Sequence, residues 1–598
     1  MPDQAPFAIF YDPDGYDIEN HPLMGRRAAG KSFLNAVFQR YPAANHFCFS
    51  ASKKHFEHFL RMAQSSGATG RATWLRADRP ELLAQAGQLY FPGPDIGLDA
   101  WRRYRRDPRG WSIIGVTHTI CTKTVMDAVA EWATAPLEDW DAVICTSPAV
   151  RGSVEYLLER QCEYLAERTG ATRFSRPHLP VIPLGIETEK FAADTSRRAR
   201  LRQRLSIGDE DVATLYVGRL SIFGKAHPLP MFIAMERAAR ASGKILHFIM
   251  AGWFATDAIK SKFQEFAAEA CPSVQVHFVD GRNEADCGDA WQAADIFLSL
   301  VDNIQETFGL TPVEAMAAGL PAVISDWNGY RDTVRHGVDG FRVPTTASPS
   351  LTGESMIDRY AAGIDSYDAY LARTSYCVAV DIEIAAQRLT QLINSKELRQ
   401  TMGAAGRERA RQVFDWATVL TQYEELSAAL AKRRLAAPPT DPKAKRIWPA
   451  RLSPFELFNR YPTRFPGPGD LVKATADQAT IDRLITGDSD AALALVSGEI
   501  NASLHDPQHT MQAARHMLGM LADGEIALGT AVGEGNAATR MERLGTILRL
   551  AKFGAVSIKA KDGKNEPRPG VIEQQHAAQN LPNTGEPESA PKTPQDGG

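Results

Sequence analysis

The sequence predicts an α/β protein with two doubly wound, Rossmann-like domains that face each other and a small, mainly helical module after them. Two observations predict this class. Short apolar runs alternate with helical patterns in two successive parts of the chain, which is typical of parallel sheets covered by helices. The alternation stops near residue 435, at a proline-rich stretch. With 598 residues and 44% apolar content, the chain can form several packed cores.

The first domain is predicted over residues 1–183 and the second over residues 184–415. In the first, the alternation is less clean: strands are expected at 7–11, 46–50, 113–116 and 142–146, and helices at 33–41 and 125–133. In the second, strands are expected at 214–217, 245–251, 274–279, 296–300 and 322–325, and helices at 230–241 and 258–270. This order of short strands and helices predicts a parallel sheet.

The remaining chain divides into three predicted parts: a proline-rich linker at 435–453, an additional mainly helical module at 454–560 and a disordered tail at 561–598. In the module, Met541, Leu544, Leu548 and Ala551 recur at helical spacing, and residues 555–558 are a candidate strand. A helix followed by a strand is compatible with a winged-helix-like module, but we favour an ordinary helical bundle. The tail is rich in Pro, Gly, Gln, Asn, Glu and Lys and cannot bury a core.

Bulk composition excludes several classes of protein. A net charge of −4 argues against a protein that coats nucleic acid, so nucleic acid is not an expected partner. The seven cysteines are an odd number without metal-ligand spacing, so neither a disulfide framework nor a zinc site is indicated. The start of the chain lacks a basic segment followed by an apolar one, and no apolar run approaches the roughly 20 residues of a membrane span. We therefore expect a cytoplasmic protein.

The most informative motif is a pair of glutamates, Glu306 and Glu314, eight positions apart. Glu306 follows the predicted strand at 296–300 in a polar turn. Glu314 lies in a helix that is expected to begin near residues 311–312 and to end at Gly319, a favoured C-cap. Both carboxylates are thus predicted at the carboxyl edge of a sheet, where open α/β sheets bind ligands.

Backbone N–H groups at the start of that helix are expected to face the same edge of the sheet. They belong to Phe308, Gly309 and Leu310. Free N–H groups at a helix N-terminus bind anions, so a phosphate and a polyhydroxy sugar could be held together here.

This block resembles the Glu-x7-Glu signature of retaining glycosyltransferases of the GT-B fold, family 4, also described as glycosyl transferases group 1. The resemblance extends in the family's order over roughly residues 180–430, through segments at 181–191, 216–220, 323–326, 338–341 and 414–416. It implies two facing lobes with the active site between them and a return helix at 416–434 that packs on the first lobe. It also implies a nucleoside-diphosphate sugar as donor, with no metal or other cofactor.

The resemblance assigns roles to individual residues. Arg219 and Lys225 would stabilise the leaving diphosphate, because a guanidinium and an ammonium both favour growing negative charge. Five residues separate them, one more than is usual in the family. Glu306 would contact the hydroxyls of the transferred sugar and Glu314 those of the ribose, since a carboxylate accepts two hydrogen bonds from a diol. Thr307 belongs to the same donor-binding loop.

Two further candidates lie at strand ends. His118 follows the first-domain strand at 113–116, where the family has a histidine that faces the sugar; a satisfied structural histidine is the alternative. Arg282 follows the strand at 274–279, in the loop that usually passes the base, and a solvated arginine is the alternative there.

Residues 25–32 (GRRAAGKS) match the pattern of a phosphate-binding P-loop, which would indicate an NTPase. Context argues against this function, because a polar stretch separates Gly25 from the first strand. The interpretation we favour keeps Gly25 and Gly30 in a loop whose amides approach the donor diphosphate or the acceptor. The structural alternative is that Gly30 and Lys31 begin the helix that continues through residue 38.

The basic-aromatic cluster at residues 101–106, from Trp101 to Arg106, is a candidate contact for anionic lipid, a lipid-linked acceptor or nucleic acid. A solvated helix face is the alternative. Peripheral contact with the inner face of a membrane therefore stays open.

Together these features predict a retaining hexosyltransferase that acts on a saccharide or lipid-linked saccharide, in surface-glycan synthesis. The alternatives are a non-catalytic GT-B-like scaffold whose C-terminal module binds a partner or nucleic acid and, more weakly, a P-loop NTPase.

Overall fold

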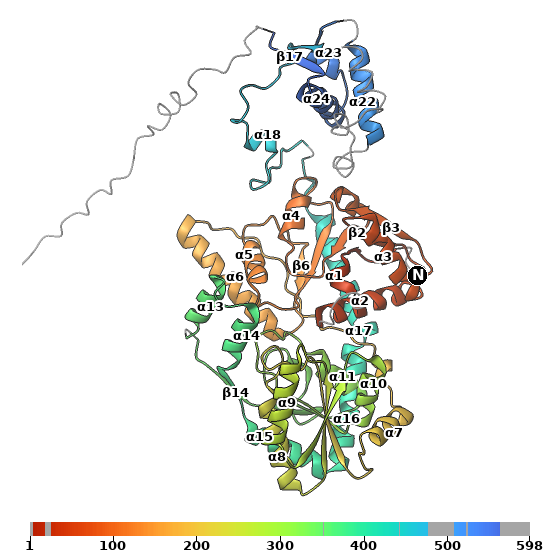
Figure 1. Ribbon diagram of the computed structural model, residues 1–598, viewed down its shortest axis with the longest axis vertical. Coiled ribbons are helices and arrows are strands. Elements are labelled where there is room, and N and C mark those ends of the chain that lie inside the picture. The colour runs from red at the N-terminus through yellow and green to blue at the C-terminus, as the bar shows by residue number, and fades with distance from the viewer. Residues whose placement is uncertain are drawn as a thin grey trace, which may run out of the picture. The chain divides into compact units, whose positions relative to one another are not determined.

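The computed structural model describes residues 4–17, 25–350, 352–441, 443–476, 507–521 and 524–561 (Figure 1). Two compact units divide the chain, Met1–Trp448 and Pro449–Gly598. The first unit contains two lobes, each built on a six-stranded sheet. This confirms the predicted α/β class with two doubly wound domains. The predicted tail beyond residue 561 lies outside the described residues, as do residues 477–506 of the predicted module.

The sheet of the first lobe is parallel throughout, with the strand order β3-β2-β1-β4-β5-β6. Its strands are β1 (Ala8–Phe10), β2 (His46–Ser50), β3 (Ala72–Arg76), β4 (Gln88–Tyr90), β5 (Ser112–Val116) and β6 (Ala142–Ile144). The larger helices are α2 (Gly25–Arg40), α3 (Lys53–Ser65), α4 (Gly97–Tyr104), α5 (Lys123–Glu131) and α6 (Pro148–Thr169), with a short α1 (Pro13–Tyr16) and a 3-10 turn η1 (Pro80–Gln85). All residues of β2 and β5 are buried, as expected for a parallel sheet with helices on both faces.

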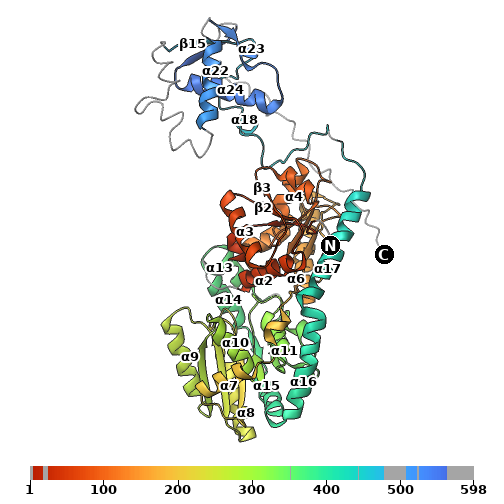
Figure 2. The same ribbon diagram turned by 90° about the vertical axis from the view of Figure 1, so that its right-hand side faces the viewer.

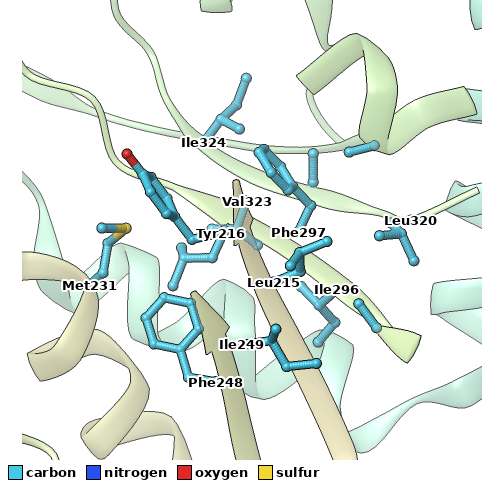
Figure 3. Close-up of a cluster of buried hydrophobic side chains, with 14 of the residues drawn as sticks. Leu215, Tyr216, Met231, Phe248, Ile249, Ile296, Phe297, Leu320, Val323 and Ile324 are labelled. Carbon is cyan, nitrogen blue, oxygen red and sulfur yellow. The ribbon is translucent and has the colours of Figure 1, made fainter. Parts of the chain in front are cut away.

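The second lobe repeats this architecture with the strand order β12-β11-β10-β7-β8-β9. Its strands are β7 (Val212–Val217), β8 (Leu246–Gly252), β9 (Val274–Asp280), β10 (Ile296–Ser299), β11 (Ala322–Ser325) and β12 (Gly340–Val343). The helices are α7 (Thr195–Arg204), α8 (Pro228–Ser242), α9 (Asp257–Ala270), α10 (Glu284–Ala293), α11 (Leu310–Ala318), α12 (Tyr330–Thr333), α15 (Ile382–Asn394) and α16 (Lys396–Arg409), with a 3-10 turn η2 (Thr188–Phe191). Leu215, Phe248 and Phe297 lie in the apolar cluster that joins sheet and helices (Figure 3).

An insertion that the sequence analysis did not predict follows β12. It consists of β13 (Thr345–Ala347), α13 (Glu354–Ala361), α14 (Tyr367–Ser375) and β14 (Val378–Val380). β13 and β14 pair in antiparallel fashion and close the insertion at its base. Its helices contact the first lobe, where the Lys123 N–H donates to the Tyr360 hydroxyl at 3.3 Å. The insertion therefore links the two lobes.

The chain crosses between the lobes twice at one place. The Ile186 N–H donates to the Phe414 carbonyl at 2.8 Å, and the Trp416 N–H donates to the Ile186 carbonyl at 3.1 Å. After a π-helical turn, η3 (Ala410–Phe414), the helix α17 (Trp416–Ala436) runs along the first lobe (Figure 2). Trp416 and Tyr423 belong to the apolar core of that lobe. The return of α17 thus fixes one lobe against the other.

The second unit contains a three-stranded antiparallel sheet in the order β16-β15-β17. Its described elements are α18 (Pro454–Leu457), β15 (Leu471–Ala474), α22 (Pro507–Met520), β16 (Ile526–Ala527), α23 (Leu528–Val532), α24 (Ala537–Lys552) and β17 (Val556–Lys559). Val472, Leu518 and Ile547 are among the buried residues between sheet and helices. In the described part of this unit, most residues that belong to helices or strands are helical, but the three-stranded sheet beside them is not part of the all-helical bundle that we favoured from the sequence.

Within the described ranges, none of the helices combines the length and the apolar character needed to cross a bilayer.

Candidate active site

The candidate site lies in the second lobe, at the carboxyl ends of β7 and β10. These neighbouring strands are parallel, so the loops that follow them emerge at the same edge of the sheet. Residues 218–227 follow β7 and include Arg219 and Lys225; residues 300–309 follow β10 and include Glu306.

The two loops are joined by an ion pair at their centre. The Lys225 Nζ lies 2.7 Å from the Glu306 Oε2, and both side chains are mostly removed from solvent. Burial alone would raise the pKa of Glu306, but the ammonium of Lys225 reverses this and lowers the pKa, with help from the Thr307 and Phe308 N–H groups. The pKa of Lys225 is raised, because Glu306 outweighs the effect of burial. At neutral pH the site therefore holds a carboxylate beside an ammonium.

Asn303 holds both loops in place. Its side-chain amide donates to the Lys225 carbonyl, and its Oδ1 accepts from the Gln305 N–H at 2.9 Å. The Trp327 indole N–H donates to the Asn303 carbonyl at 2.8 Å. Asn303 was not among the predicted site residues; the available signal was its place beside Asp302, where the chain turns polar a few residues after the buried strand β10.

Arg219 lies in the same loop as Lys225, and its side chain turns back toward the backbone of that loop. Its guanidinium is 3.4 Å from the Gly224 carbonyl, and a Cβ at Gly224 would collide with it. The Gly224 N–H donates to the Ser221 hydroxyl at 3.0 Å, which closes a turn. This turn accommodates the additional residue between Arg219 and Lys225, so both cations belong to one compact loop.

Helix α11 begins at this edge of the sheet, at Leu310, close to the predicted start. Its N-cap, Gly309, has a φ of 93°, and a Cβ there would collide with the Tyr330 ring. Because no side chain caps this end, the first backbone N–H groups of α11 are open to an anion. Gly319 caps the other end, as predicted, with a φ of 75°.

Glu314 is carried by the second turn of α11. Burial raises its pKa to about 7, although the charge of Lys225 acts in the opposite direction. Asp302, between β10 and the Glu306 loop, also has a pKa raised by burial to about 7. The site thus combines one firmly ionised carboxylate, Glu306, with two carboxyls that titrate near neutrality.

The first lobe contacts this site through the Glu306 loop. The Thr307 hydroxyl donates to the His118 carbonyl, and the Ser147 hydroxyl donates to the Thr307 carbonyl at 2.7 Å. The structure therefore brings the backbone of His118 beside the residue that follows Glu306.

The inserted helices also reach the site. The Tyr367 hydroxyl donates to the Gln305 Oε1 at 3.2 Å, and the Cys121 Sγ of the first lobe lies 3.3 Å from the same hydroxyl. Tyr367 thus bridges the loop of Glu306 and the opposite lobe. Sequence analysis missed Tyr367 because it lies in an element with no motif, 62 residues from Gln305.

The P-loop alternative is contradicted by the local structure. Residues 25–32 form the first turns of α2, and their backbone is helical instead of forming a phosphate-binding loop. Gly30 allows α2 to approach α1, since a Cβ there would collide with the Gly15 carbonyl. Ser32 accepts a hydrogen bond from the Trp416 indole at 2.7 Å. The favoured interpretation, in which Gly25 and Gly30 lie in a loop, is therefore wrong, because both lie in α2. The structural alternative is right that Gly30 and Lys31 are helical, although the helix begins earlier, at Gly25.

Arg282 is separated from the ion pair by the strand order. It follows β9, and β8 lies between β9 and β7. Its guanidinium pairs with both carboxylate oxygens of Asp280, at 2.9 and 2.7 Å, on an exposed surface. The structure does not bring Arg282 together with Lys225 and Glu306.

Only part of the basic-aromatic cluster at 101–106 is exposed on the surface. Arg103 is fully buried, and its guanidinium lies 2.5 and 2.6 Å from the two carboxylate oxygens of Asp141. Trp101 stacks on Trp448 with 5.9 Å between ring centroids. The prediction of a lipid or nucleic-acid contact is therefore wrong for Arg103, because its helix face points into the core.

Comparisons with known proteins find similarity to glycosyltransferases in the second lobe. The sequence profile of the family described as glycosyl transferases group 1 matches residues 197–357. The D-inositol 3-phosphate glycosyltransferase of Nocardia farcinica is 29% identical over 185 residues, which is 31% of this chain and 39% of that protein. The phosphatidyl-myo-inositol mannosyltransferase of Mycobacterium leprae is 28% identical over 167 residues, or 27% and 35% of the two chains.

Among solved structures, Anabaena HepE in complex with UDP is similar, with a TM-score of 0.47 and 16% identity over 71% of this chain and all of that one. This chain spans less than half the length of either curated relative. The profile match includes the loops that contain Arg219, Lys225 and Glu306 and the helix α11 that contains Glu314. Residues 197–357 of the second lobe are thus similar to the glycosyl transferases group 1 family, and the two six-stranded parallel sheets form the two-lobed architecture that the GT-B fold class predicts.

Proposed function

We propose that the protein is a retaining glycosyltransferase that moves a hexosyl residue from a nucleoside-diphosphate sugar to a saccharide or lipid-linked saccharide. The observation that carries this proposal is the Lys225–Glu306 pair at 2.7 Å, at the same edge of the sheet as the uncapped N-terminus of α11. A cation and free N–H groups suit a diphosphate, and a carboxylate suits sugar hydroxyls.

In this proposal Lys225 keeps its contact with Glu306 and gains a second contact when the donor binds. When a diphosphate binds, the ammonium contacts a phosphate oxygen as well as the Glu306 carboxylate. The bond between the anomeric carbon and the diphosphate oxygen then breaks, and Lys225 and Arg219 stabilise the charge that grows on the leaving group. The acceptor hydroxyl attacks from the same face and passes its proton to a phosphate oxygen, so the anomeric configuration is retained without a covalent enzyme intermediate.

Glu306 and Glu314 take different parts in binding. Glu306 is held as a carboxylate by Lys225 and accepts hydrogen bonds from hydroxyls of the transferred sugar. Glu314, on α11, accepts from the ribose, and it does so best when ionised. Because its pKa is about 7, we expect the KM for the donor to fall as the pH rises through that value.

We propose that no metal is needed, since Arg219, Lys225 and the α11 N-terminus together supply positive potential for the diphosphate. The relatives include a phosphatidyl-myo-inositol mannosyltransferase, which supports a lipid-linked acceptor for this chain. A role in the synthesis of a surface glycan is part of the same proposal.

The test is a panel of uridine, guanosine and adenosine diphosphate sugars, incubated with the full-length protein in EDTA. We expect slow release of the diphosphate from one donor and transfer to added saccharide, with an anomeric configuration by NMR that matches the donor. Release that requires magnesium would refute metal independence, and an inverted product would refute retention. If no nucleotide sugar binds or reacts, the non-catalytic scaffold becomes the better account.

A further inference from the structure

A short segment of the second unit exposes an unusual amount of apolar surface. Residues 453–465, called here the docking segment, precede the sheet of that unit. Phe455 is 66% exposed and Tyr461 is 81% exposed, and Leu457, Phe458 and Phe465 are also exposed. Single exposed apolar residues are ordinary, but five within eleven positions form a patch of the kind that contacts another surface.

The docking segment is held on the unit at its C-terminal end. The Arg464 guanidinium pairs with the Asp470 carboxylate and donates to the Ile558 carbonyl in β17 at 3.1 Å. Within the segment, the rings of Phe458 and Tyr461 lie 5.0 Å apart. The apolar side chains are therefore presented from an anchored segment.

The backbone of the segment disfavours two common kinds of protein partner. Pro454 and Pro462 interrupt it, and α18, at Pro454–Leu457, is a single turn. A segment of this kind cannot lay a long amphipathic helix into a groove, and its prolines cannot donate to an added strand.

The charge around the segment favours an anionic partner. Residues 443–465 contain six cationic side chains and one acidic one, a net charge of +5, in a chain whose net charge is −4. The cations are Lys443, Lys445, Arg446, Arg451, Arg460 and Arg464, and the acid is Glu456. Aromatic rings between basic residues are suited to the interface of a bilayer, where rings enter the headgroup layer and cations meet lipid phosphates.

We propose that the docking segment binds the surface of a membrane that contains anionic lipid. The rings of Phe455, Tyr461 and Phe465 enter the interface, while Arg451 and Arg460 contact lipid phosphates. This inference does not depend on the proposed transferase activity. It would hold the enzyme where a lipid-linked acceptor is found, and it assigns the contact to the second unit instead of to residues 101–106.

The test is flotation of the full-length protein with vesicles of phosphatidylcholine alone or with 30% phosphatidylglycerol. We expect binding to the anionic vesicles only, weakened as salt is raised from 50 to 500 mM. Phe455→Ser/Tyr461→Ser should lower the partition coefficient at least tenfold. Arg451→Gln/Arg460→Gln should lower it by about 25-fold, since each cation near an anionic surface contributes about 1 kcal/mol, or about fivefold.

The matched control is Tyr156→Ser/Tyr164→Ser, which removes two exposed rings from α6 in the first lobe and should leave partitioning unchanged. Thermal unfolding of each variant establishes that it is folded. Equal binding to neutral and anionic vesicles, or undiminished binding of both docking variants, would overturn the proposal. So would a wild-type dimer that Phe455→Ser/Tyr461→Ser dissociates, or binding to a DNA duplex without binding to vesicles, because the segment or its unit would then serve another partner.

Discussion

Replacement of Lys225 by methionine tests two expected effects of the Lys225–Glu306 pair, one on the stability of the fold and one on the rate of the reaction. At 2.7 Å and an effective dielectric constant of about 20, the two charges attract by about 6 kcal/mol before desolvation is subtracted. Lys225→Met leaves a carboxylate in the site without its cation, which should lower the free energy of unfolding by about 1–3 kcal/mol, between the limits for exposed and buried pairs. It should also remove a donor to the leaving diphosphate and lower kcat by about 10²–10³, or roughly 2.7–4 kcal/mol.

Steady-state kinetics with the donor that the panel identifies, together with thermal unfolding, measures both effects. Lys225→Met/Glu306→Gln should regain most of the lost stability, because no uncompensated charge remains, but it should not regain activity. Lys262→Met is the matched control, since Lys262 pairs with Glu265 on the exposed face of α9, and neither measurement should change. A Lys225→Met enzyme with kcat within threefold of wild type would refute the assignment of Lys225 to the leaving group.

Four further outcomes are expected. Arg219→Ala should lower kcat by about a hundredfold or more with little change in melting temperature, and an unchanged kcat would remove Arg219 from the site. Burial raises the pKa of Glu314 from 4.5 to about 7, so the native state binds more protons over that interval and the wild type should lose stability as the pH rises across it. Glu314→Gln should flatten this slope in a pH series of thermal melts, by at most about 3 kcal/mol, and an unaltered slope would contradict a buried proton there. Tyr367→Phe removes the hydroxyl between Cys121 and Gln305 and should lower kcat/KM by about fivefold, as expected for the loss of one hydrogen bond, without unfolding the protein. A wild-type kcat/KM would show that this contact does not contribute to catalysis. A chain truncated after Trp448 should fold and release diphosphate from its donor, whereas an insoluble or inactive product would show that the second unit completes the enzyme.

Much of the fold could be predicted because its signals are local. Apolar runs such as 296–300 and 322–325 became β10 and β11, and Gly319 marked the end of α11. β3 and β4 were missed, the first because as an edge strand it is only partly buried and the second because it has three residues. The inserted helices were missed because contacts with the first lobe hold them, and sequence periodicity does not report such contacts.

The same distinction applies to the site. Glu306 and Glu314 could be proposed because they lie before and inside a helix whose start and end the sequence itself defines, whereas Lys225 was proposed from the resemblance to a known family. Tyr367 could not, since it approaches from a distant segment. The cluster at 101–106 misled for a related reason: a run of basic residues indicates a surface, but the helix turns Arg103 inward to Asp141, 38 positions away.

The central claim is that Lys225, Arg219 and the N-terminus of α11 bind the diphosphate of a sugar nucleotide. Isothermal titration of the full-length protein with UDP, GDP and ADP in EDTA tests it most directly, with Lys225→Met and Lys262→Met measured beside the wild type. The claim predicts that one diphosphate binds the wild type and Lys262→Met equally, and that Lys225→Met binds it at least about tenfold more weakly, as expected for a charge-assisted hydrogen bond. Equal affinity of all three proteins, or binding of ATP with magnesium alone, would contradict it.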